Sequence, residues 1–357
     1  MSTPASPPSA YPPAAAARAT IADVAREAGV SKATVSRFLN HRDTLLTKDI
    51  ASRVEVAIAA LAYSPSPMAQ ALKRGRSRLI GLVVADVTNP FSVAVLRGAE
   101  KACQDAGYLV MLFNLGNDSQ REVEAIEALS AYQVEGFILN TLGSDATATA
   151  QAARHGKPVV LVDRRHHGMQ ADYVSLDNVG AVGMGVRHLM EAGYRELLFI
   201  SEPIKTVSSR EEREAAFYSV VQASAPRVAG LQGCTFETTA DNPDALDEAL
   251  RSLRQRAGQR LAGVVSSNAV VTLRVVAAMA RLGWQFGSDI GLLGFDDTEW
   301  SAYVGPGLST IVQPTDDIGR IAASCLIERL KGSVLPPRQI LLPGTLLPRG
   351  SSQPAAR

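Results

Sequence analysis

The chain has few cysteines and no long apolar run. Its three cysteines, Cys103, Cys234 and Cys325, are odd in number and widely spaced, which does not fit a disulfide framework and indicates reduced thiols in a cytoplasmic protein. No stretch approaches the roughly 18 consecutive apolar residues of a membrane span, so we expect no membrane partner. Residues 1–19 are rich in Pro, Ala and Ser and lack the apolar segment of a signal peptide, so we expect a disordered tail there.

Motifs of cofactor and catalytic chemistry are also missing. The glycines at 180, 183 and 185 follow an expected strand, but their spacing does not fit the dinucleotide fingerprint. The adjacent pair His166-His167 has no Cys or third His nearby in the sequence, so we expect no metal site. No GxSxG, Walker loop or HExxH is present. We therefore expect no cofactor and assign no catalytic residue, although missing motifs do not exclude an enzyme.

The sequence has almost no net charge, yet its charges are unevenly distributed. With 46% hydrophobic and 20% charged residues over 357 positions, the composition is that of a globular chain of two or three domains. The first 76 residues hold ten Lys+Arg and five Asp+Glu, a net +5, whereas the remainder holds 26 and 30, a net −4. A basic head on an acidic body fits a polyanion as the partner of the head alone.

Residues 20–40, TIADVAREAGVSKATVSRFLN, carry two short helical patterns on either side of Gly29. Thr20 fits the cap of a helix over 21–28, Gly29 fits its end, and Ser31 fits the cap of a second helix over 32–40. The outer face of the second helix would present only small and basic residues, namely Lys32, Ala33, Thr34, Ser36 and Arg37. This pattern is typical of a helix-turn-helix that enters the DNA major groove, and the alternative is a helical hairpin in a larger α domain. A third helix over 48–61 would close the head.

The same stretch resembles the lactose-repressor/galactose-repressor family of bacterial transcription regulators. The matching residues are Ile21-Ala22-Asp23-Val24-Ala25, Ala28-Gly29-Val30-Ser31, Thr34-Val35-Ser36-Arg37 and Leu39-Asn40. We expect Lys32, Ala33 and Arg37 to contact base edges. Thr34, Ser36 and Asn40 are expected to contact phosphates, and Ser31 is also predicted to bind DNA. The resemblance covers residues 20–348 and implies a helix-turn-helix domain over 20–63, a hinge and linker over 64–77, and an effector-binding and dimerisation domain over 78–348, with a tail over 349–357.

Residues 63–75, YSPSPMAQALKRG, fit either a plain linker or a helix of about two turns. Such a helix is too short to persist alone in water. The resemblance implies a hinge helix that orders on the operator and inserts Leu72 into the minor groove, although Ser66 stands where the family often has Asn. The DNA-contacting residues expected here are Ser66, Ala69, Leu72 and Lys73.

Beyond residue 78, apolar runs of strand length alternate with amphipathic helical patterns. We predict strands at 79–85, 109–114, 136–139 and 159–163, and a second series at 173–176, 197–201, 235–237, 263–266, 290–294 and 310–313. The intervening helices are predicted at 92–106, 120–132, 146–155, 178–192, 210–224, 245–256, 270–282 and 315–330. This alternation predicts an α/β body of two doubly wound parallel-sheet lobes with a cleft between them. The resemblance implies the fold of periplasmic sugar-binding proteins.

Polar and aromatic residues follow several of these strands and would meet at the rim of the cleft. Carboxylates accept hydrogen bonds from vicinal hydroxyls, Arg offers a bidentate fork to a carboxylate, and Phe91 or Trp300 can stack on a sugar face. Singly, each Asp or Asn fits a helix cap equally well, Asn268 and Asp296 in particular. Their convergence and the resemblance together predict the effector-binding residues Asn89, Phe91, Asp163, Arg164, Ser208, Arg210, Asn268, Asp296, Trp300 and Gln313.

Three phrases further resemble the branch of the family that responds to 2-ketogluconate and related keto-sugar acids. They are Ser201-Glu202-Pro203, Ser209-Arg210-Glu211 with Arg213, and Gly294-Phe295-Asp296-Asp297 with Trp300. We therefore predict a cytoplasmic repressor that binds near-palindromic double-stranded operator DNA as a homodimer under control of a sugar or sugar-acid effector. The alternatives are a sugar-processing enzyme with a DNA-binding head, which turnover would reveal, and an architectural DNA protein, which a thermal-shift panel of sugar acids would separate.

Overall fold

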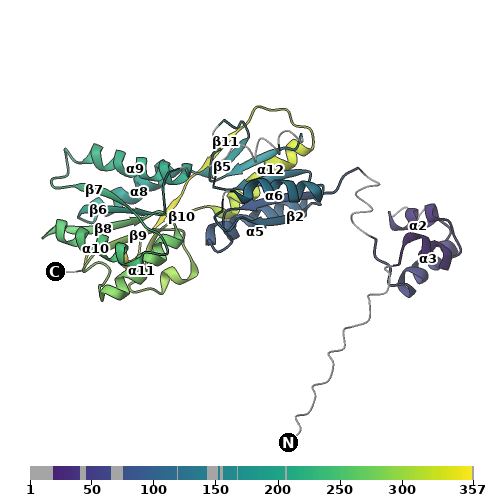
Figure 1. Cartoon of the computed structure of the whole chain (residues 1–357), viewed down its shortest axis with the longest axis horizontal. Helices are drawn as coiled ribbons and strands as arrows, with labels where there is room; N and C mark the ends of the chain where they lie inside the picture. Colours follow the sequence, from purple (N-terminus) through teal and green to yellow (C-terminus); the bar gives the residue numbers. More distant parts are fainter. Residues whose placement is uncertain are drawn as a thin grey trace, which may run out of the picture. The chain divides into compact units, whose positions relative to one another are not determined.

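The computed structural model describes residues 19–40, 46–65, 75–118, 120–142, 152, 156–166, 168–205 and 207–355. The chain divides into two units, Met1–Ser77 and Arg78–Arg357, and Figure 1 shows a helical first unit and an α/β second unit. Within the described ranges no helix is long and apolar enough to cross a membrane. The expected N-terminal tail, the hinge residues Ser66, Ala69, Leu72 and Lys73, and the helix over 146–155 except Ala152 lie outside these ranges.

The first unit is a three-helix head whose helix ends follow the predicted capping residues. Its helices are α1 (Ile21–Glu27), α2 (Lys32–Leu39) and α3 (Lys48–Ala60). The Asp23 N–H donates to Thr20 Oγ1 at 3.3 Å and the Thr20 N–H donates to Asp23 Oδ2 at 2.9 Å, which completes the capping box. Gly29 has φ +63° and ends the first helix as expected. The helices close on a small core of Val24, Ala25, Ala28, Val35, Val54 and Ala57.

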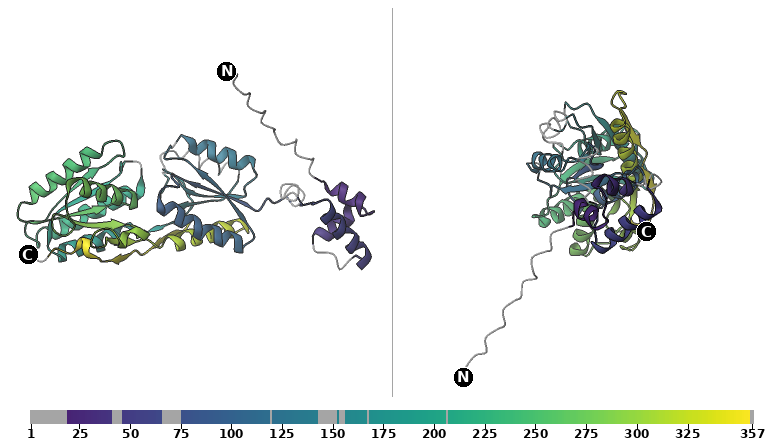
Figure 2. Two further views of the ribbon diagram at one scale, coloured as in Figure 1. Left: turned by 90° about the horizontal axis from the view of Figure 1, so that it is seen from below. Right: turned by 90° about the vertical axis from the view of Figure 1, so that its right-hand side faces the viewer.

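The second unit begins with a lobe built on a six-stranded sheet in the order β11-β5-β4-β3-β1-β2. Every pairing in this sheet is parallel, as the sequence pattern predicted. Helices α5 (Pro90–Asp105) and α12 (Thr315–Leu330) cover one face, and α6 (Arg121–Ala131) lies on the other (Figure 2). The strands are β1 (Leu79–Val84), β2 (Leu109–Asn114), β3 (Gly136–Asn140), β4 (Val159–Val162), β5 (Asp172–Leu176) and β11 (Gln339–Leu342).

The second lobe has the same layered plan, with strand order β12-β10-β9-β8-β6-β7. Its pairings are parallel except that β12 runs antiparallel to β10. Helices α8 (Asn178–Glu191) and α9 (Ser208–Ser224) cover one face, and α10 (Pro243–Ala257) and α11 (Ala269–Leu282) cover the other. The strands are β6 (Tyr194–Ser201), β7 (Gln232–Glu237), β8 (Leu261–Ser266), β9 (Gly291–Phe295), β10 (Ser309–Val312) and β12 (Thr345–Leu347).

The chain passes between the two lobes three times, from β5 to α8, from β10 to α12 and from β11 to β12. The strand at 173–176 was predicted to start the second series, but as β5 it pairs with β4 and β11 in the first sheet, so the first passage comes one strand later than predicted. The third passage was missed. Strands β11 and β12 are short, half exposed and separated by Pro343-Gly344, so they resemble a linker in the sequence. Asn178 lies at the first passage and Gln313 at the second, which places both side chains where the lobes join.

Two glycines allow α5 and α12 to pack closely under the first sheet. A Cβ at Gly98 would lie 2.1 Å from the Asp316 carbonyl oxygen, and a Cβ at Gly319 would lie 2.1 Å from the Val95 carbonyl oxygen. Any larger residue at either position would force the two backbones apart, so these glycines determine how closely α12 packs on the first lobe.

The segment after Pro348 is not a tail, which corrects the predicted boundary. Ser351 and Ser352 are fully buried, and Ser351 Oγ donates to the Leu292 carbonyl oxygen at 2.7 Å. Arg349 forms a bidentate ion pair with Asp297, at 2.6 and 3.0 Å. No apolar pattern marks this segment in the sequence, because hydrogen bonds of small polar side chains hold it on β9 and β10.

Candidate DNA-binding and effector sites

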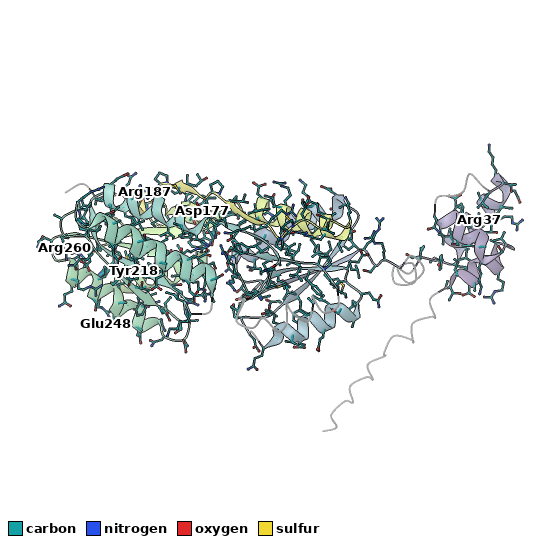
Figure 3. The ribbon with its side chains drawn as sticks, turned by 90° about the horizontal axis from the view of Figure 1, so that it is seen from above. Arg37, Asp177, Arg187, Tyr218, Glu248 and Arg260 are labelled. Atoms are coloured by element: carbon teal, nitrogen blue, oxygen red, sulfur yellow. The ribbon has the colours of Figure 1, made fainter. Side chains whose placement is uncertain are left out.

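Helix α2 presents the predicted reading face to solvent. Lys32, Ala33 and Arg37 are exposed, Thr34 and Ser36 are half-buried, and Val35 is fully buried against α1 and α3. Figure 3 shows the Arg37 side chain on the surface of the head. Helix α2 contains no acidic residue, so its exposed face carries only positive charge and small polar groups. This is the surface that a DNA backbone and the edges of bases require.

Two polar residues at the ends of α2 have structural hydrogen bonds. Ser31 Oγ accepts from the Thr34 N–H at 3.2 Å and lies 3.0 Å from Thr34 Oγ1, so Ser31 caps the helix. Asn40 Nδ2 donates to the Ser36 carbonyl oxygen at 2.6 Å and closes the carboxyl end. Contacts of Ser31 and Asn40 with phosphate would add to these caps, and they remain predictions.

Arg213 of α9 lies at the centre of the polar cluster between the lobes and is only 5% exposed. Its Nε donates to Asn178 Oδ1 at 2.8 Å, Nη1 to the Ser267 carbonyl oxygen at 2.5 Å, and Nη2 to Gln313 Oε1 at 3.3 Å. The guanidinium also stacks on the Phe295 ring, 4.4 Å from its centroid. Arg213 therefore contacts two of the three passages between the lobes. Arg213 belongs to one of the phrases that resemble the keto-sugar-acid branch, but the predicted effector residue was Arg210, one helical turn earlier.

The loop after β4, in the first lobe, contacts the start of α9, in the second lobe. Asp163, at φ +64°, accepts from Ser209 Oγ at 3.1 Å and lies 3.7 Å from Arg213 Nη2. Arg164 Nη1 donates to the Thr141 carbonyl oxygen at 3.2 Å, and burial lowers the pKa of its guanidinium despite the neighbouring Asp163. Ser208 Oγ accepts from the Arg165 N–H at 2.8 Å. Three predicted residues, Asp163, Arg164 and Ser208, thus lie together at this lobe contact.

A second group of predicted residues surrounds Asp296, which follows β9 at φ +65°. Asp296 Oδ1 accepts from Gln313 Nε2 at 2.7 Å, and Oδ2 accepts from the Ala269 N–H at 3.2 Å. Burial raises the pKa of the Asp296 carboxyl, which the nearby Arg213 and the Gln313 hydrogen bond oppose. Asn268 caps α11 through the Val271 N–H at 2.9 Å, so the alternative role of helix cap does apply to it.

A cavity of about 430 Å³ lies beside Asp296 and is lined from both lobes. The first lobe contributes Phe91 at the start of α5, and the second contributes Trp300, Asp296 and Gln313. Two aromatic side chains beside a carboxylate and an amide suit one face of a sugar ring and its hydroxyl groups. Asn89 does not line this cavity; its Oδ1 accepts from the Phe91 N–H at 3.1 Å and caps α5.

Arg210, predicted to bind the effector, pairs with a carboxylate of the protein. Its Nη2 donates to Glu202 Oε2 at 2.6 Å and its Nη1 to the Pro203 carbonyl oxygen at 2.9 Å. Asn268 Nδ2 donates to the same Glu202 oxygen at 3.0 Å. Burial lowers the pKa of Arg210, while Glu202 raises it. Glu202 belongs to one of the phrases that resemble the keto-sugar-acid branch but was not predicted as a site residue. The available signal was its place directly after strand β6.

A helix-turn-helix head on a two-lobed α/β body with a polar cleft between the lobes defines a ligand-responsive, DNA-binding transcription regulator. Residues 20–66 match the model of the bacterial regulatory proteins of the lacI family, and residues 186–352 match a periplasmic binding protein-like domain. The chain belongs to the lacI family of bacterial regulatory proteins, whose members are transcription regulators and not enzymes.

The relatives cover nearly the whole chain. The HTH-type transcriptional regulator PtxS of Pseudomonas plecoglossicida is 45% identical over 335 residues, which cover 94% of this chain and 96% of the relative. The HTH-type transcriptional regulator KdgR of Bacillus subtilis is 37% identical, with 93% and 97% covered. The structure of the lac repressor dimer bound to operator and the anti-inducer ONPF has a TM-score of 0.80 at 23% identity, covering 94% of this chain and 100% of that one. That likeness confirms the predicted fold class.

Proposed function

We propose that this chain is a repressor whose affinity for operator DNA is controlled by a sugar acid, 2-ketogluconate or a related keto-sugar acid, bound between the two lobes. The observation that carries the proposal is the composition of the cleft. Three guanidinium groups, from Arg164, Arg210 and Arg213, lie near one another, and Arg213 donates to Gln313, which in turn donates to Asp296. Arginines suit the carboxylate of a sugar acid, and Asp296 and Gln313 suit its hydroxyl groups.

The position of the cluster explains how a ligand would act on the body. Arg213 contacts Asn178 and Gln313, which lie at two of the three passages between the lobes. Phe91 of the first lobe and Trp300 of the second line one cavity. A ligand that contacts both side chains binds more tightly to the conformation with one angle between the lobes than to a conformation with another angle. This difference in affinity shifts the equilibrium between the two conformations.

We further propose that the effector site consists of the predicted residues together with Arg213, and that the head reads DNA through Lys32, Ala33 and Arg37. Two heads of a homodimer would each read one half of a near-palindromic operator, because the symmetry of the dimer requires a symmetric site. The hinge residues Ser66, Ala69, Leu72 and Lys73 would add contacts in the minor groove. We place this function in the cytoplasm, where the DNA lies.

The test is operator binding by the full-length protein across a panel of sugar acids and neutral sugars. Fluorescence anisotropy at one fixed salt concentration should show that an acid such as 2-ketogluconate changes the operator Kd by about fivefold or more. Affinity for random DNA should not change, because it depends mainly on phosphate charge. An operator Kd that no acid in the panel alters would refute the proposed effector class.

A further inference from the structure

A cluster of hydrogen-bond donors in the second lobe already holds a carboxylate that belongs to the protein. Glu202 Oε2 accepts from Arg210 Nη2 at 2.6 Å and from Asn268 Nδ2 at 3.0 Å, and Glu202 Oε1 lies 3.6 Å from Arg274 Nη2. We call Arg210, Asn268 and Arg274 the carboxylate seat. Its donors come from α9 and from the amino-terminal part of α11, where the helix dipole also favours negative charge.

The carboxylate seat adjoins the cavity between the lobes. Asn268 is followed by Ala269, whose N–H donates to Asp296 Oδ2 at 3.2 Å, and Asp296 lines the cavity. The side chains of Glu202, Arg210 and Arg274 are 18%, 12% and 23% exposed, so solvent reaches all three. An ion pair sealed in a core would exclude a ligand, whereas this pair is open to one.

The charges require that an anion occupy the carboxylate seat. Two guanidinium groups with reduced exposure cost free energy when they lack an anionic partner. The carboxylate of a ligand that replaces Glu202 would leave the charge of the seat unchanged, and Glu202, on the short segment between β6 and α9, would turn toward water. A neutral sugar offers no replacement charge, so it would have to bind with Glu202 in place.

We propose that Glu202 is an internal carboxylate that occupies the seat for the effector's carboxylate, and that sugar acids bind by displacing it. The inference deepens the proposed function and rests on it. It makes Glu202 a specificity-determining residue, because displacement by a carboxylate admits acids and rejects neutral sugars. The competing explanation is that Glu202 permanently positions Arg210, in which case removing its charge would weaken the binding of acids.

The test is isothermal titration of the full-length protein and its Glu202→Gln variant with gluconate, 2-ketogluconate and glucose. Glu202→Gln removes the competing charge but keeps the size of the side chain, so the Kd for the acids should fall by about tenfold. The Kd for glucose should change by less than about twofold, because glucose has no charge to place in the seat. The matched control is Glu248→Gln, which removes an exposed carboxylate on α10 outside the cavity and should leave the Kd for the acids within about twofold. Adding Arg210→Gln to Glu202→Gln should abolish the gain, and thermal melting checks that each variant is folded.

The outcomes separate this inference from the proposed function. Titration of the native chain tests the sugar-acid class, and the ratio of variant to native Kd tests the role of Glu202. If the native chain binds an acid that Glu202→Gln binds equally or more weakly, displacement is overturned and the proposed function stands. If only the variant binds acids, displacement is supported and the native effector is not one of those acids. If neither protein binds any acid, both proposals are overturned.

Discussion

Replacing Arg213 with Ala should destabilise the body more than any other single change in the cleft. Its guanidinium is 5% exposed and makes three hydrogen bonds, at 2.8, 2.5 and 3.3 Å, to Asn178, the Ser267 carbonyl oxygen and Gln313. Removal leaves these three acceptors without this donor and takes one of two neighbouring cations away from the Asp163 carboxylate. Each orphaned buried acceptor costs about 1–3 kcal/mol, and breaking a buried charge pair costs about 3–5 kcal/mol.

These costs do not add, because one side chain supplies all of the interactions and the neighbours can relax together. We therefore expect Arg213→Ala to lower the free energy of unfolding by about 3–5 kcal/mol in total. Urea titration measures the change, and tryptophan fluorescence reports it directly, since Trp284 and Trp300 both lie in the second lobe. The effector response should be lost as well, because Arg213 contacts both Asn178 and Gln313 where the lobes join.

The matched control is Arg210→Ala on the same helix. Its side chain is 12% exposed and its partners, Glu202 and the Pro203 carbonyl oxygen, lie nearer solvent, so the expected loss is about 1–2 kcal/mol. A loss below about 1 kcal/mol for Arg213→Ala, or an equal loss for both variants, would refute the central structural role that we assign to Arg213.

Other predictions concern the head, the cavity and the acid stability of the first lobe. Arg37→Ala should weaken operator binding by about 1–3 kcal/mol without changing the melting of the body, and an unchanged operator Kd would remove Arg37 from the reading face. Asp296→Ala should abolish the effector response in operator-binding titrations and leave operator affinity without effector near normal; a native dose response would exclude Asp296 from the site. Although burial raises the pKa of Asp172, hydrogen bonds from Arg329 and Arg338 lower it to about 2. Because this folded pKa lies below the unfolded value, the stabilisation is present above about pH 4 and is lost as the pH falls toward 2. Asp172→Asn should therefore lose less stability than the native chain between pH 5 and pH 2 in urea titrations, and parallel curves would contradict this account.

The sequence by itself determined most of the helices and strands and their order along the chain. Capping residues such as Thr20 and Ser31 and the positive φ of Gly29 are local features, so the helix-turn-helix could be predicted nearly to the residue. Buried apolar strands separated by amphipathic helices predicted two parallel-sheet lobes for the same reason, since periodicity is a property of neighbouring residues. The fold class was confirmed. Strands β11 and β12 were missed because Pro343-Gly344 separates two short, half-exposed runs whose pairing depends on distant strands.

Only the tertiary structure decided which polar side chains bond to one another. The sequence placed Asp163, Arg210, Asn268, Asp296 and Gln313 after strands, but it could not show that Arg213 contacts Gln313, 100 residues away, or that Asn268 and Arg210 share Glu202. Arg210 and Arg213 have the same chemistry and lie one turn apart on α9, so local pattern gives no reason to prefer either. Their partners come from other strands and from the passages between the lobes, and hydrogen bonds of this kind form only when the chain has closed on itself.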